Sequence, residues 1–346
     1  MKIAIIHNQY RLKGGIESYL FSLLNGFAVA GDTTFVTAFK VDSQAPQLPA
    51  STVKKIKLTF VPRVLREYVF AKKIASTLQR DAYDLTLSLT KTFNQDIIIS
   101  GGTHLGFLRQ MHKRLSVRDR ITLYLEKKGF ASSKKIIAHS QLIKDDLIDL
   151  YGVDPQKISL LHPPINTHVF NHQARDCREK TQDEFGLNRD KVTLLFPSTG
   201  HKRKGLDLLI AAMRQLPAAQ YELVIVGSKP SHAYYADNIR YLGFVQDIAK
   251  LYAAVDFTIL PSLYEPFGLV IVESLQCGTP VIVAKNVGAS SLVTAAEGVV
   301  IEHLSPEIIA RSITQAMHSQ FNILPDFAVR HGLTIDKHIE KIKQLI

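Results

Sequence analysis

The chain has 346 residues, of which 46% are apolar and 21% are charged, and this length favours two domains of roughly 150 to 180 residues each. The even apolar content excludes a low-complexity or disordered chain, and the presence of only two cysteines excludes a disulfide scaffold. No apolar run is long enough for a membrane span or a secretory signal. We therefore expect a protein of a reduced, cytosolic compartment that is soluble or bound to a membrane only at its surface.

The net charge of +11 is confined to the first part of the chain. Residues 1–150 hold 23 Lys and Arg against 12 Asp and Glu, whereas residues 151–346 hold 19 of each. A surplus in one part predicts one basic surface, and such a surface attracts an anionic partner. From the charge alone, this partner can be nucleic acid, an anionic membrane or a phosphorylated molecule.

The first half of the chain predicts a parallel α/β sheet. The short apolar strand at 2–6 is followed by a glycine-containing loop at 8–15 and then by apolar residues at helical spacing from Ile16 onward. Strands and helices alternate after that, as a doubly wound sheet requires, because each parallel strand needs a crossover of a dozen or more residues. We expect further strands at 34–38, 85–89, 97–99, 136–138 and 158–161, and helices at 67–78 and 141–151.

A domain boundary is predicted after Pro163 and Pro164, because these residues end the last strand and the polar stretch 166–189 has no sustained periodicity. A second alternating series follows. The sequence thus predicts α/β domains at 1–164 and 165–335, and an amphipathic helix at 336–346 that can pack back on the first domain. The second series comprises strands at 192–196, 222–226, 257–260 and 281–284, and helices at 206–216, 248–254, 268–276 and 306–318.

Two loops of the first domain are candidate ligand-binding loops, since ligands of open α/β sheets bind beyond the carboxyl ends of the strands. Both carry paired glycines, which let the backbone approach a ligand closely. Lys13-Gly14-Gly15 precedes the first helix, and a tight turn is the alternative interpretation. Ser100-Gly101-Gly102-Thr103-His104 follows a strand, and a structural or merely exposed His104 is the alternative there.

Two further candidate loops lie in the second domain. The basic segment 201–205 starts a helix, where cations oppose the helix dipole unless an anion is bound; a solvated basic turn is the alternative. Glu265 lies in a loop, and Glu273 lies two turns into the next helix among apolar residues, where a carboxylate needs a partner such as ribose hydroxyls. Paired carboxylates also occur in glycoside hydrolases, but those usually come from separate strands.

With these residues in place, the chain resembles the retaining glycosyltransferases of family 4, which have the GT-B fold. The most specific part is the E-x7-E motif of Glu265 and Glu273, with Cys-Gly-Thr-Pro-Val at 277–281 after it. Gly14-Gly15 with Glu17 beyond it, and His104, match two further family features. The resemblance implies an α/β fold of two Rossmann-like doubly wound domains facing each other across a cleft, with acceptor binding in the first domain and nucleotide-sugar binding in the second.

The resemblance also implies roles for individual residues. Glu265 faces the donor sugar, Glu273 holds the ribose, and Lys204 grips the diphosphate. The family's usual arginine, six residues before this lysine, is replaced by Ser198, and Arg203 is taken as its substitute. The residues implied are His104, Glu265, Lys204 and Arg203 for catalysis and Gly14, Gly15, Phe267, Gly268, Leu269 and Glu273 for donor binding.

The implied reaction moves a sugar from a nucleotide diphosphate donor, a UDP-sugar by family habit, to an acceptor hydroxyl with retention of configuration. No D-x-D sequence occurs in the chain, so no metal or other cofactor is expected. Within the family, the chain looks most like enzymes that build the lipopolysaccharide core. A nucleotide-sugar epimerase or hydrolase on the same fold is one alternative; a basic nucleic-acid-binding protein is another, which the neutral second domain opposes.

The stretch from Leu108 to Lys135 is strongly basic, with apolar residues near helical spacing. A basic amphipathic segment is typical of membrane-surface binding, and one or two ordinary solvated helices are the alternative. We therefore expect a cytoplasmic protein, peripheral on the inner face of the cytoplasmic membrane, that binds a lipid-linked phosphorylated glycan and no nucleic acid. The residues expected to face membrane or acceptor are Arg109, Lys113, Arg114, Arg118, Arg120, Lys127 and Lys128.

Overall fold

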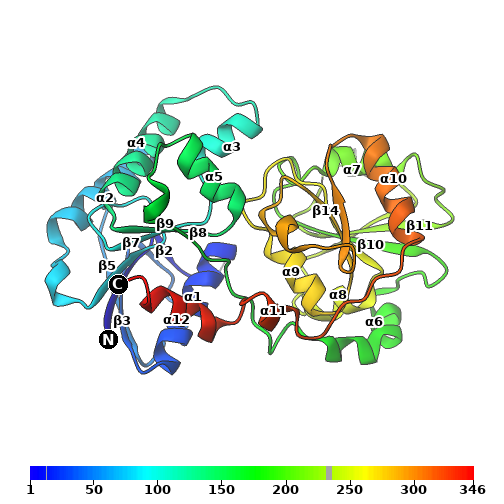
Figure 1. Ribbon diagram of the computed structural model, residues 1–346, viewed down its shortest axis with the longest axis horizontal. Helices are drawn as coiled ribbons and strands as arrows, with labels where there is room; N and C mark the ends of the chain where they lie inside the picture. The colour runs from blue at the N-terminus through cyan, green and yellow to red at the C-terminus, as the bar shows by residue number, and fades with distance from the viewer. Residues whose placement is uncertain (13, 231–235) are drawn as a thin grey trace. The chain divides into compact units, whose positions relative to one another are not determined.

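The computed structural model describes residues 1–12, 14–230 and 236–346, and it divides into two compact units (Figure 1). The first unit comprises Met1–Pro164 and Gly332–Ile346, and the second comprises Ile165–His331. Lys13 of the first glycine loop lies outside the described residues. Because the chain leaves the first unit once and returns to it at Gly332, the second unit is an insertion into the first.

Within the described residues, seven parallel strands form the main sheet of the first unit. Its inner strands are apolar on both faces, as a parallel sheet covered by helices requires; residues 3–6, for example, are at most 3% exposed. The strands are β1 (Lys2–Ile6), β3 (Thr33–Ala38), β5 (Ser51–Lys55), β6 (Leu85–Ser88), β7 (Ile97–Ser100), β8 (Lys135–Ala138) and β9 (Ile158–Leu160), and a separate pair consists of β2 (Gln9–Tyr10) and β4 (Lys40–Val41).

The strand order β5-β3-β1-β6-β7-β8-β9 reverses at β1, which pairs with β3 on one side and β6 on the other. The loops after β1 and β6 therefore diverge, and this leaves a crevice at the carboxyl edge of the sheet. The helices of this unit are α1 (Gly15–Val29), α2 (Arg66–Thr77), α3 (His104–Gln110), α4 (Val117–Ser132), α5 (Gln141–Asp149) and α12 (Ile335–Lys343).

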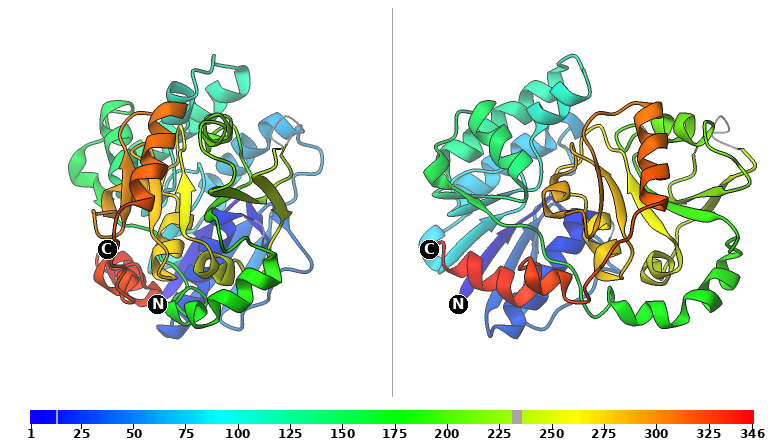
Figure 2. Two further views of the ribbon diagram at one scale, coloured as in Figure 1. Left: turned by 90° about the vertical axis from the view of Figure 1, so that its right-hand side faces the viewer. Right: turned by 45° about the vertical axis from the view of Figure 1, so that its right-hand side comes forward.

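The C-terminal helix α12 completes the core of the first unit by packing along α1 (Figures 1 and 2). Ile339 and Ile342 join the same apolar cluster as the buried face of α1, and a Cβ on Gly26 would lie 2.6 Å from Ile335 Cγ1. The phenol oxygen of Tyr19 and Nε2 of His338 are hydrogen-bonded at 2.7 Å, both buried. The two helices are thus held by close apolar packing and one buried polar contact.

The second unit repeats the same plan. Its described strands follow the order β12-β11-β10-β13-β14-β15, which reverses between β10 and β13. They are β10 (Val192–Ser198), β11 (Tyr221–Gly227), β12 (Ile239–Gly243), β13 (Phe257–Leu260), β14 (Val281–Ala284) and β15 (Gly298–Ile301), with helices α6 (Arg178–Phe185), α7 (Leu206–Met213), α8 (Ile248–Ala254), α9 (Leu269–Gln276), α10 (Pro306–Met317) and α11 (Phe327–Arg330).

The structure differs from the sequence-based expectation in the polar stretch 166–189 and at the sheet edges. The stretch contains α6, whose buried residues are Thr181 and Gln182, so it has no apolar periodicity to reveal it. Five described strands have no predicted counterpart: β2 and β4 form the separate pair, and β5, β12 and β15 occupy edges of the two main sheets. β5 has the polar sequence Ser-Thr-Val-Lys-Lys and is mostly exposed, and edge strands of this kind lack the continuous apolar run of a central parallel strand.

We expect the first unit to lose stability in acid because its buried histidines are neutral. Burial lowers the pKa of His139 and of His338 to about 3, whereas an unfolded histidine titrates near 6.5. The contribution of these two neutral histidines to the free energy of unfolding is therefore complete above about pH 6.5. It is lost as the pH falls toward 3, because the unfolded chain takes up protons that the folded chain does not. Urea unfolding at pH 7.5 and pH 5.0 measures this loss.

The variant His338→Gln should lose less stability between these two pH values than the original chain. His112→Asn, a substitution of an exposed histidine of the same unit, should leave the loss unchanged. An equal loss in all three proteins would contradict the assignment of the acid sensitivity to His338.

Candidate functional site

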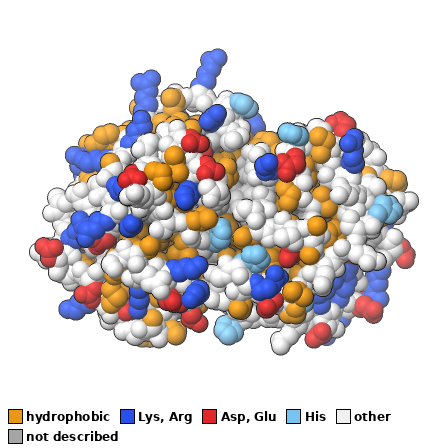
Figure 3. Space-filling model, in the orientation of Figure 1, with side chains coloured by type: hydrophobic (Ala, Val, Ile, Leu, Met, Phe, Trp, Pro, Cys, Tyr) orange, Lys and Arg blue, Asp and Glu red, His pale blue; other side chains and the backbone are white. Residues whose placement is uncertain are grey.

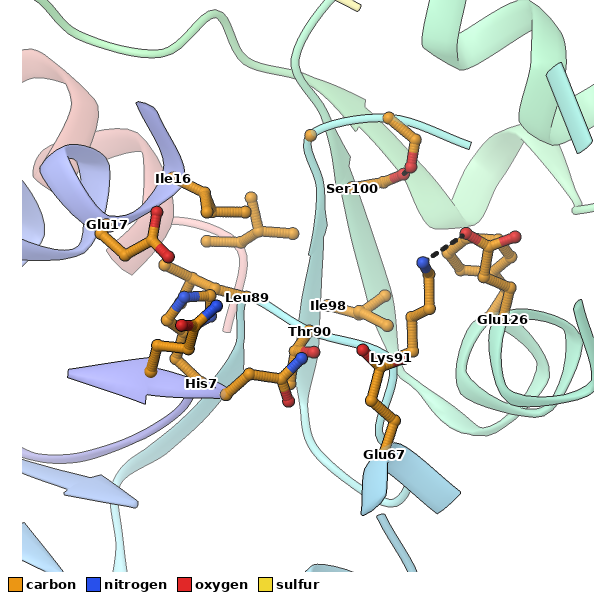
Figure 4. Close-up of a pocket in the computed structure, with 16 residues that line it drawn as sticks. His7, Ile16, Glu17, Glu67, Leu89, Thr90, Lys91, Ile98, Ser100 and Glu126 are labelled. Carbon is orange, nitrogen blue, oxygen red and sulfur yellow. Dashed lines mark hydrogen bonds and ion pairs between the residues drawn. The ribbon is translucent and has the colours of Figure 1, made fainter. Parts of the chain in front are cut away.

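The crevice of the first unit contains a cavity of about 250 Å³ at the switch between β1 and β6 (Figure 4). Its walls come from the loop after β1, the first turn of α1, the loop after β6 and the end of β7 with Gly101 and Gly102. Figure 4 shows His7 and Glu17 on one side and Lys91 and Glu126 on the other. The cavity therefore carries titratable groups on both sides.

Glu126 is the most constrained of these groups. Its carboxylate is 2% exposed, lies 3.6 Å from Lys91 Nζ, and accepts the backbone N–H of His104 at 3.0 Å and 3.2 Å through its two oxygens. The hydroxyl of Tyr151 donates a further hydrogen bond to it. Burial raises the pKa of Glu126, while Lys91, Tyr151 and His104 oppose the rise. Glu126 thus fixes the start of α3 and positions Lys91 at the cavity.

His7 lies directly after β1 and is 4% exposed. Burial lowers the pKa of His7 to about 4, so its imidazole is neutral at pH 7. Glu67, from the start of α2, lines the cavity on the same side as Lys91 (Figure 4). His7, Glu67, Lys91 and Glu126 were not among the site residues predicted from the sequence. The position of His7 immediately after a strand was the signal available for it.

His104 takes a different position from the one its motif suggested. It is the first residue of α3, and its Nε2 lies 2.7 Å from Asp119 Oδ1. Hydrogen bonds from Ser116, with a smaller effect of His104, hold the pKa of Asp119 well below its usual range. His104 is not among the side chains that line the cavity. Its predicted catalytic role stays a prediction.

The predicted glycine pair lies at the start of α1. Gly14 adopts a φ of +108° and is the N-cap of that helix, a conformation that favours glycine. Gly14 and Gly15 do not line the cavity themselves, but the next residues, Ile16 and Glu17, do. The glycine pair thus determines the backbone conformation at the start of α1, the helix whose first turn places Glu17 in the crevice.

The second unit has its own switch point, between β10 and β13, and the loops after these strands approach closely. Gly205 adopts a φ of +79°, and a Cβ there would overlap the carbonyl oxygen of Pro261. The backbone N–H of Leu263 donates to the carbonyl of Arg203 at 2.9 Å. The basic segment 201–205 and the E-x7-E loop are thus joined through their main chains.

Side chains strengthen this connection. Arg203 Nη1 donates to Glu265 Oε2 at 2.7 Å and to the carbonyl of Tyr264 at 2.9 Å. Lys204 Nζ donates to the carbonyl of Pro197 at 2.9 Å. Burial lowers the pKa of Lys204, and the neighbouring carboxylates of Glu265 and Glu273 counteract this effect. The structure therefore brings the four predicted charged residues of this unit together at one edge of the sheet.

Glu273 faces this group from the second turn of α9. The hydroxyl of Tyr252 donates to Glu273 Oε2 at 3.1 Å. Burial raises the pKa of Glu273 to about 7, while Tyr252 and Lys204 oppose the rise. Tyr252 is thus a residue of this site that was not predicted from the sequence.

The predicted donor-binding segment Phe267-Gly268-Leu269 is held by the loop after β14. The backbone N–H of Ala289 donates to the carbonyl of Phe267 at 2.7 Å, and that of Gly288 donates to the carbonyl of Glu265 at 2.9 Å. Gly268 adopts a φ of +91° and precedes α9. This segment is thereby fixed at the entrance to the helix that carries Glu273.

Ser198, which stands where the family usually has an arginine, has a different partner. Its hydroxyl lies 2.9 Å from His201 Nδ1, and Nε2 of the same ring lies 2.9 Å from the carbonyl oxygen of Ser228. His201 thus links the end of β10 to the residue after β11. Arg203, the predicted substitute, lies beside Glu265 and is 30% exposed.

The basic stretch of the first unit forms α3, α4 and the segment between them, and Figure 3 shows Lys and Arg side chains projecting over this region. Of the apolar residues at helical spacing, Leu108 is 4% exposed and Leu125 is fully buried, so these two side chains belong to the interior of the unit. The exposed apolar residues of this stretch are Leu115 at 52%, Val117 at 74% and Tyr124 at 46%. Of the seven predicted cations, Lys128 is partly buried and lies over the Phe93 ring, and the others are exposed.

Neither a membrane-spanning helix nor a metal cluster is found in the part of the chain that the structure describes. No helix there combines the length and apolar character needed to cross a membrane. No group of three or more His, Cys, Asp or Glu in those residues could hold a metal ion.

Comparison with known proteins places the chain in a family. Residues 178–329 match the family described as glycosyl transferases group 1, and residues 13–169 match glycosyltransferase family 4. A relative from Burkholderia thailandensis, named a probable transglycosylase, is 32% identical over 353 residues, which cover 100% of this chain and 96% of the relative. The chain therefore belongs to the glycosyltransferases of family 4.

Solved structures agree on the fold. WaaG, described as a glycosyltransferase involved in lipopolysaccharide biosynthesis, matches with a TM-score of 0.82 at 20% identity over 99% of both chains. HepE of Anabaena, solved with UDP and glucose, matches with a TM-score of 0.76 at 19% identity over 99% of this chain and 98% of that one. The predicted GT-B fold class and the prediction of a transferase are thus confirmed.

We expect Gly205→Ala to destabilise the second unit by roughly 2–4 kcal/mol, because the added methyl combines a left-handed backbone with overlap on Pro261. Gly243→Ala is the matched control, since Gly243 has a φ of +76° and its nearest heavy atom would lie at 4.0 Å; it should cost only about 1 kcal/mol. Chemical denaturation measures both changes. Equal costs would show that the contact of Gly205 with Pro261 does not constrain the two loops.

Proposed function

We propose that this glycosyltransferase is a retaining enzyme that moves a sugar from a UDP-sugar to a lipid-linked, phosphorylated glycan, in the assembly of a lipopolysaccharide core. The observation that carries this proposal is the grouping of Arg203, Lys204, Glu265 and Glu273 at the carboxyl edge of the second sheet. Two structural neighbours support this proposal. WaaG, which is described as involved in lipopolysaccharide biosynthesis, supports the proposed pathway, and HepE, which was solved with UDP-glucose, supports a UDP-sugar as the donor.

In this proposal the second unit binds the donor. Lys204 and Arg203 neutralise the charge that develops on the departing diphosphate, and such electrostatic stabilisation is usually the largest contribution to catalysis. Glu273 accepts hydrogen bonds from the ribose hydroxyls, with Tyr252 fixing one carboxylate oxygen at 3.1 Å. Glu265, held by Arg203 at 2.7 Å, faces the transferred sugar. Cations of the chain take the place of a metal, so transfer is proposed to be metal-independent.

The first unit binds the acceptor in this proposal. The cavity beyond β1, β6 and β7 carries carboxylates and the neutral imidazole of His7, and these groups are suited to hydrogen-bonding sugar hydroxyls. Lys91 and Glu126 form the opposite wall. Orientation of the acceptor hydroxyl by such fixed groups is the positioning that a transfer reaction needs.

The segment between α3 and α4 is proposed to lie on an anionic membrane surface. Lys113, Arg114 and Leu115 are exposed there, and Val117 and Arg118 are exposed in the adjoining first turn of α4. Cations attract anionic lipid headgroups while exposed apolar side chains enter the interface. In this proposal the enzyme is peripheral on the inner face of the cytoplasmic membrane, where its lipid-linked acceptor is accessible.

The test is incubation of the protein with a panel of labelled nucleotide sugars, with and without membranes that carry the truncated lipopolysaccharide acceptor. The proposal expects acceptor-dependent transfer of the label from one UDP-sugar, with the anomeric configuration retained in the product by NMR and no loss of rate in EDTA. Release of free sugar alone, or conversion of the donor sugar, would support the hydrolase or epimerase alternative. Failure to bind any nucleotide sugar would refute the proposal.

We expect Lys204→Ala to lower turnover by about 100-fold or more, because it removes a cation from the developing charge of the leaving group. Lys202→Ala, a change in an exposed lysine of the same loop, should leave turnover within about twofold. Thermal unfolding of both variants separates a catalytic from a structural effect. Near-normal turnover of a folded Lys204→Ala enzyme would remove Lys204 from the mechanism.

We expect the double variant Lys113→Gln, Arg114→Gln to bind phosphatidylglycerol vesicles about 30-fold more weakly, since each cation near an anionic surface contributes roughly 1 kcal/mol. Lys2→Gln with Lys54→Gln removes the same charge from exposed positions elsewhere in the first unit and should have a much smaller effect. Vesicle co-sedimentation measures both. Equal losses would show that total charge, and not the segment between α3 and α4, determines binding.

A further inference from the structure

A second cavity of the first unit, of about 390 Å³, is lined by four cations: Lys40, Lys55, Lys57 and Arg66. Its volume falls within the range of about 300–1,000 Å³ that small-molecule sites occupy. It lies beyond the carboxyl ends of β3 and β5 and against the start of α2. It is therefore on the same edge of the sheet as the cavity of the proposed acceptor site.

The cations of this cavity lack carboxylate partners. Between Asp42 and Glu67 the chain has five basic residues and no acidic one, and the described residues that line the cavity include no carboxylate. Within the described residues none of the four cations forms an ion pair, and the hydrogen bond of Arg66 Nε goes to the carbonyl of Val61 at 3.0 Å. Cations that converge without a counter-charge repel one another, and a bound anion removes that cost.

Two links connect this cavity to the one beside β1. Arg66 and Glu67, the first two residues of α2, line the second and the first cavity respectively. The carbonyl of Asn8, which lines the first cavity, accepts the backbone N–H groups of Phe39 at 3.3 Å and Lys40 at 3.1 Å, and both of these line the second. The two cavities are therefore neighbours along the sheet edge.

We infer that this cationic cavity binds a phosphomonoester carried by the acceptor glycan, an inference that rests on the proposed function. A phosphomonoester has a charge of about −1.5 to −2 at pH 7 and three acceptor oxygens, which the lysine ammonium groups and the guanidinium of Arg66 match as donors. Phe39 and Leu58 supply an apolar wall for the sugar that bears the phosphate. The cavity thereby selects phosphorylated over unphosphorylated acceptors.

A lipid headgroup is the other source of the same phosphate chemistry. Phe60, next to the cavity-lining residue Thr59, is 98% exposed, and an exposed aromatic beside cations is also suited to a lipid surface. The experiment therefore needs a soluble sugar phosphate and a lipid phosphate as separate probes.

The test measures binding of glucose 6-phosphate, glucose and inorganic phosphate to the full chain by ligand-observed ³¹P and ¹H NMR, without any nucleotide sugar. The variant Lys55→Gln, Lys57→Gln should bind glucose 6-phosphate roughly tenfold more weakly, since charge-assisted hydrogen bonds are the strong ones in such a site. The matched control is Lys54→Gln with Lys2→Gln: Lys54 neighbours Lys55 on β5 but points to the opposite face, and Lys2 starts β1 at the other end of the strands.

A loss of glucose 6-phosphate binding in the cavity variant alone, with no measurable binding of glucose to any protein, supports the inference. Equal binding by the cavity and control variants overturns it. Binding of phosphatidic acid vesicles that depends on Lys55 and Lys57, without binding of the soluble sugar phosphate, also overturns it and assigns the cavity to a lipid headgroup. Because no donor is present, these outcomes are independent of whether UDP-sugar transfer is found.

When an acceptor is in hand, the cavity variant should raise KM for the phosphorylated acceptor roughly tenfold and leave KM for its dephosphorylated form unchanged. The affinity for UDP should stay the same in both variants. A uniform fall in kcat for both acceptors would contradict a role in acceptor selection.

Discussion

Burial of both faces of a parallel sheet is the constraint on which the rest of this structure depends. Strands such as β1 and β14 are apolar on both sides and are covered by helices, so polar chemistry is confined to the loops at the strand ends. The reversal of strand order then determines which loops separate enough to admit a ligand. Both units obey this constraint, and in both the charged side chains gather beside the reversal.

The electrostatics beside the two reversals of strand order differ accordingly. In the second unit burial lowers the pKa of Lys204 and raises the pKa of Glu273, while Arg203 and Glu265 form an ion pair at 2.7 Å in the same group. An anion beside Lys204 would raise the pKa of that ammonium again, and under the proposed function the diphosphate does so. In the first unit Glu126 lies 3.6 Å from Lys91 and also accepts the N–H at the start of α3, and four other cations line a separate cavity.

The sequence predicted the central strands well and the edges poorly, for one physical reason. A central parallel strand is a continuous apolar run, and β1, β13 and β14 have the predicted bounds, whereas the exposed β5 and the helix that buries Thr181 and Gln182 carry no such run. The E-x7-E loop was found because its spacing is local in the chain. Lys91 and Glu126 were not, because their proximity depends on which strands become neighbours.

The return of the chain to the first unit at Gly332 has a consequence for how the protein folds during synthesis. The second unit is continuous in sequence, so all its strands and helices leave the ribosome together and can fold as one body. The first unit buries the side of α1 against α12, and Tyr19 meets His338 across 319 positions of sequence. The apolar side of α1 that α12 covers is therefore exposed to solvent until the last helix has been synthesised.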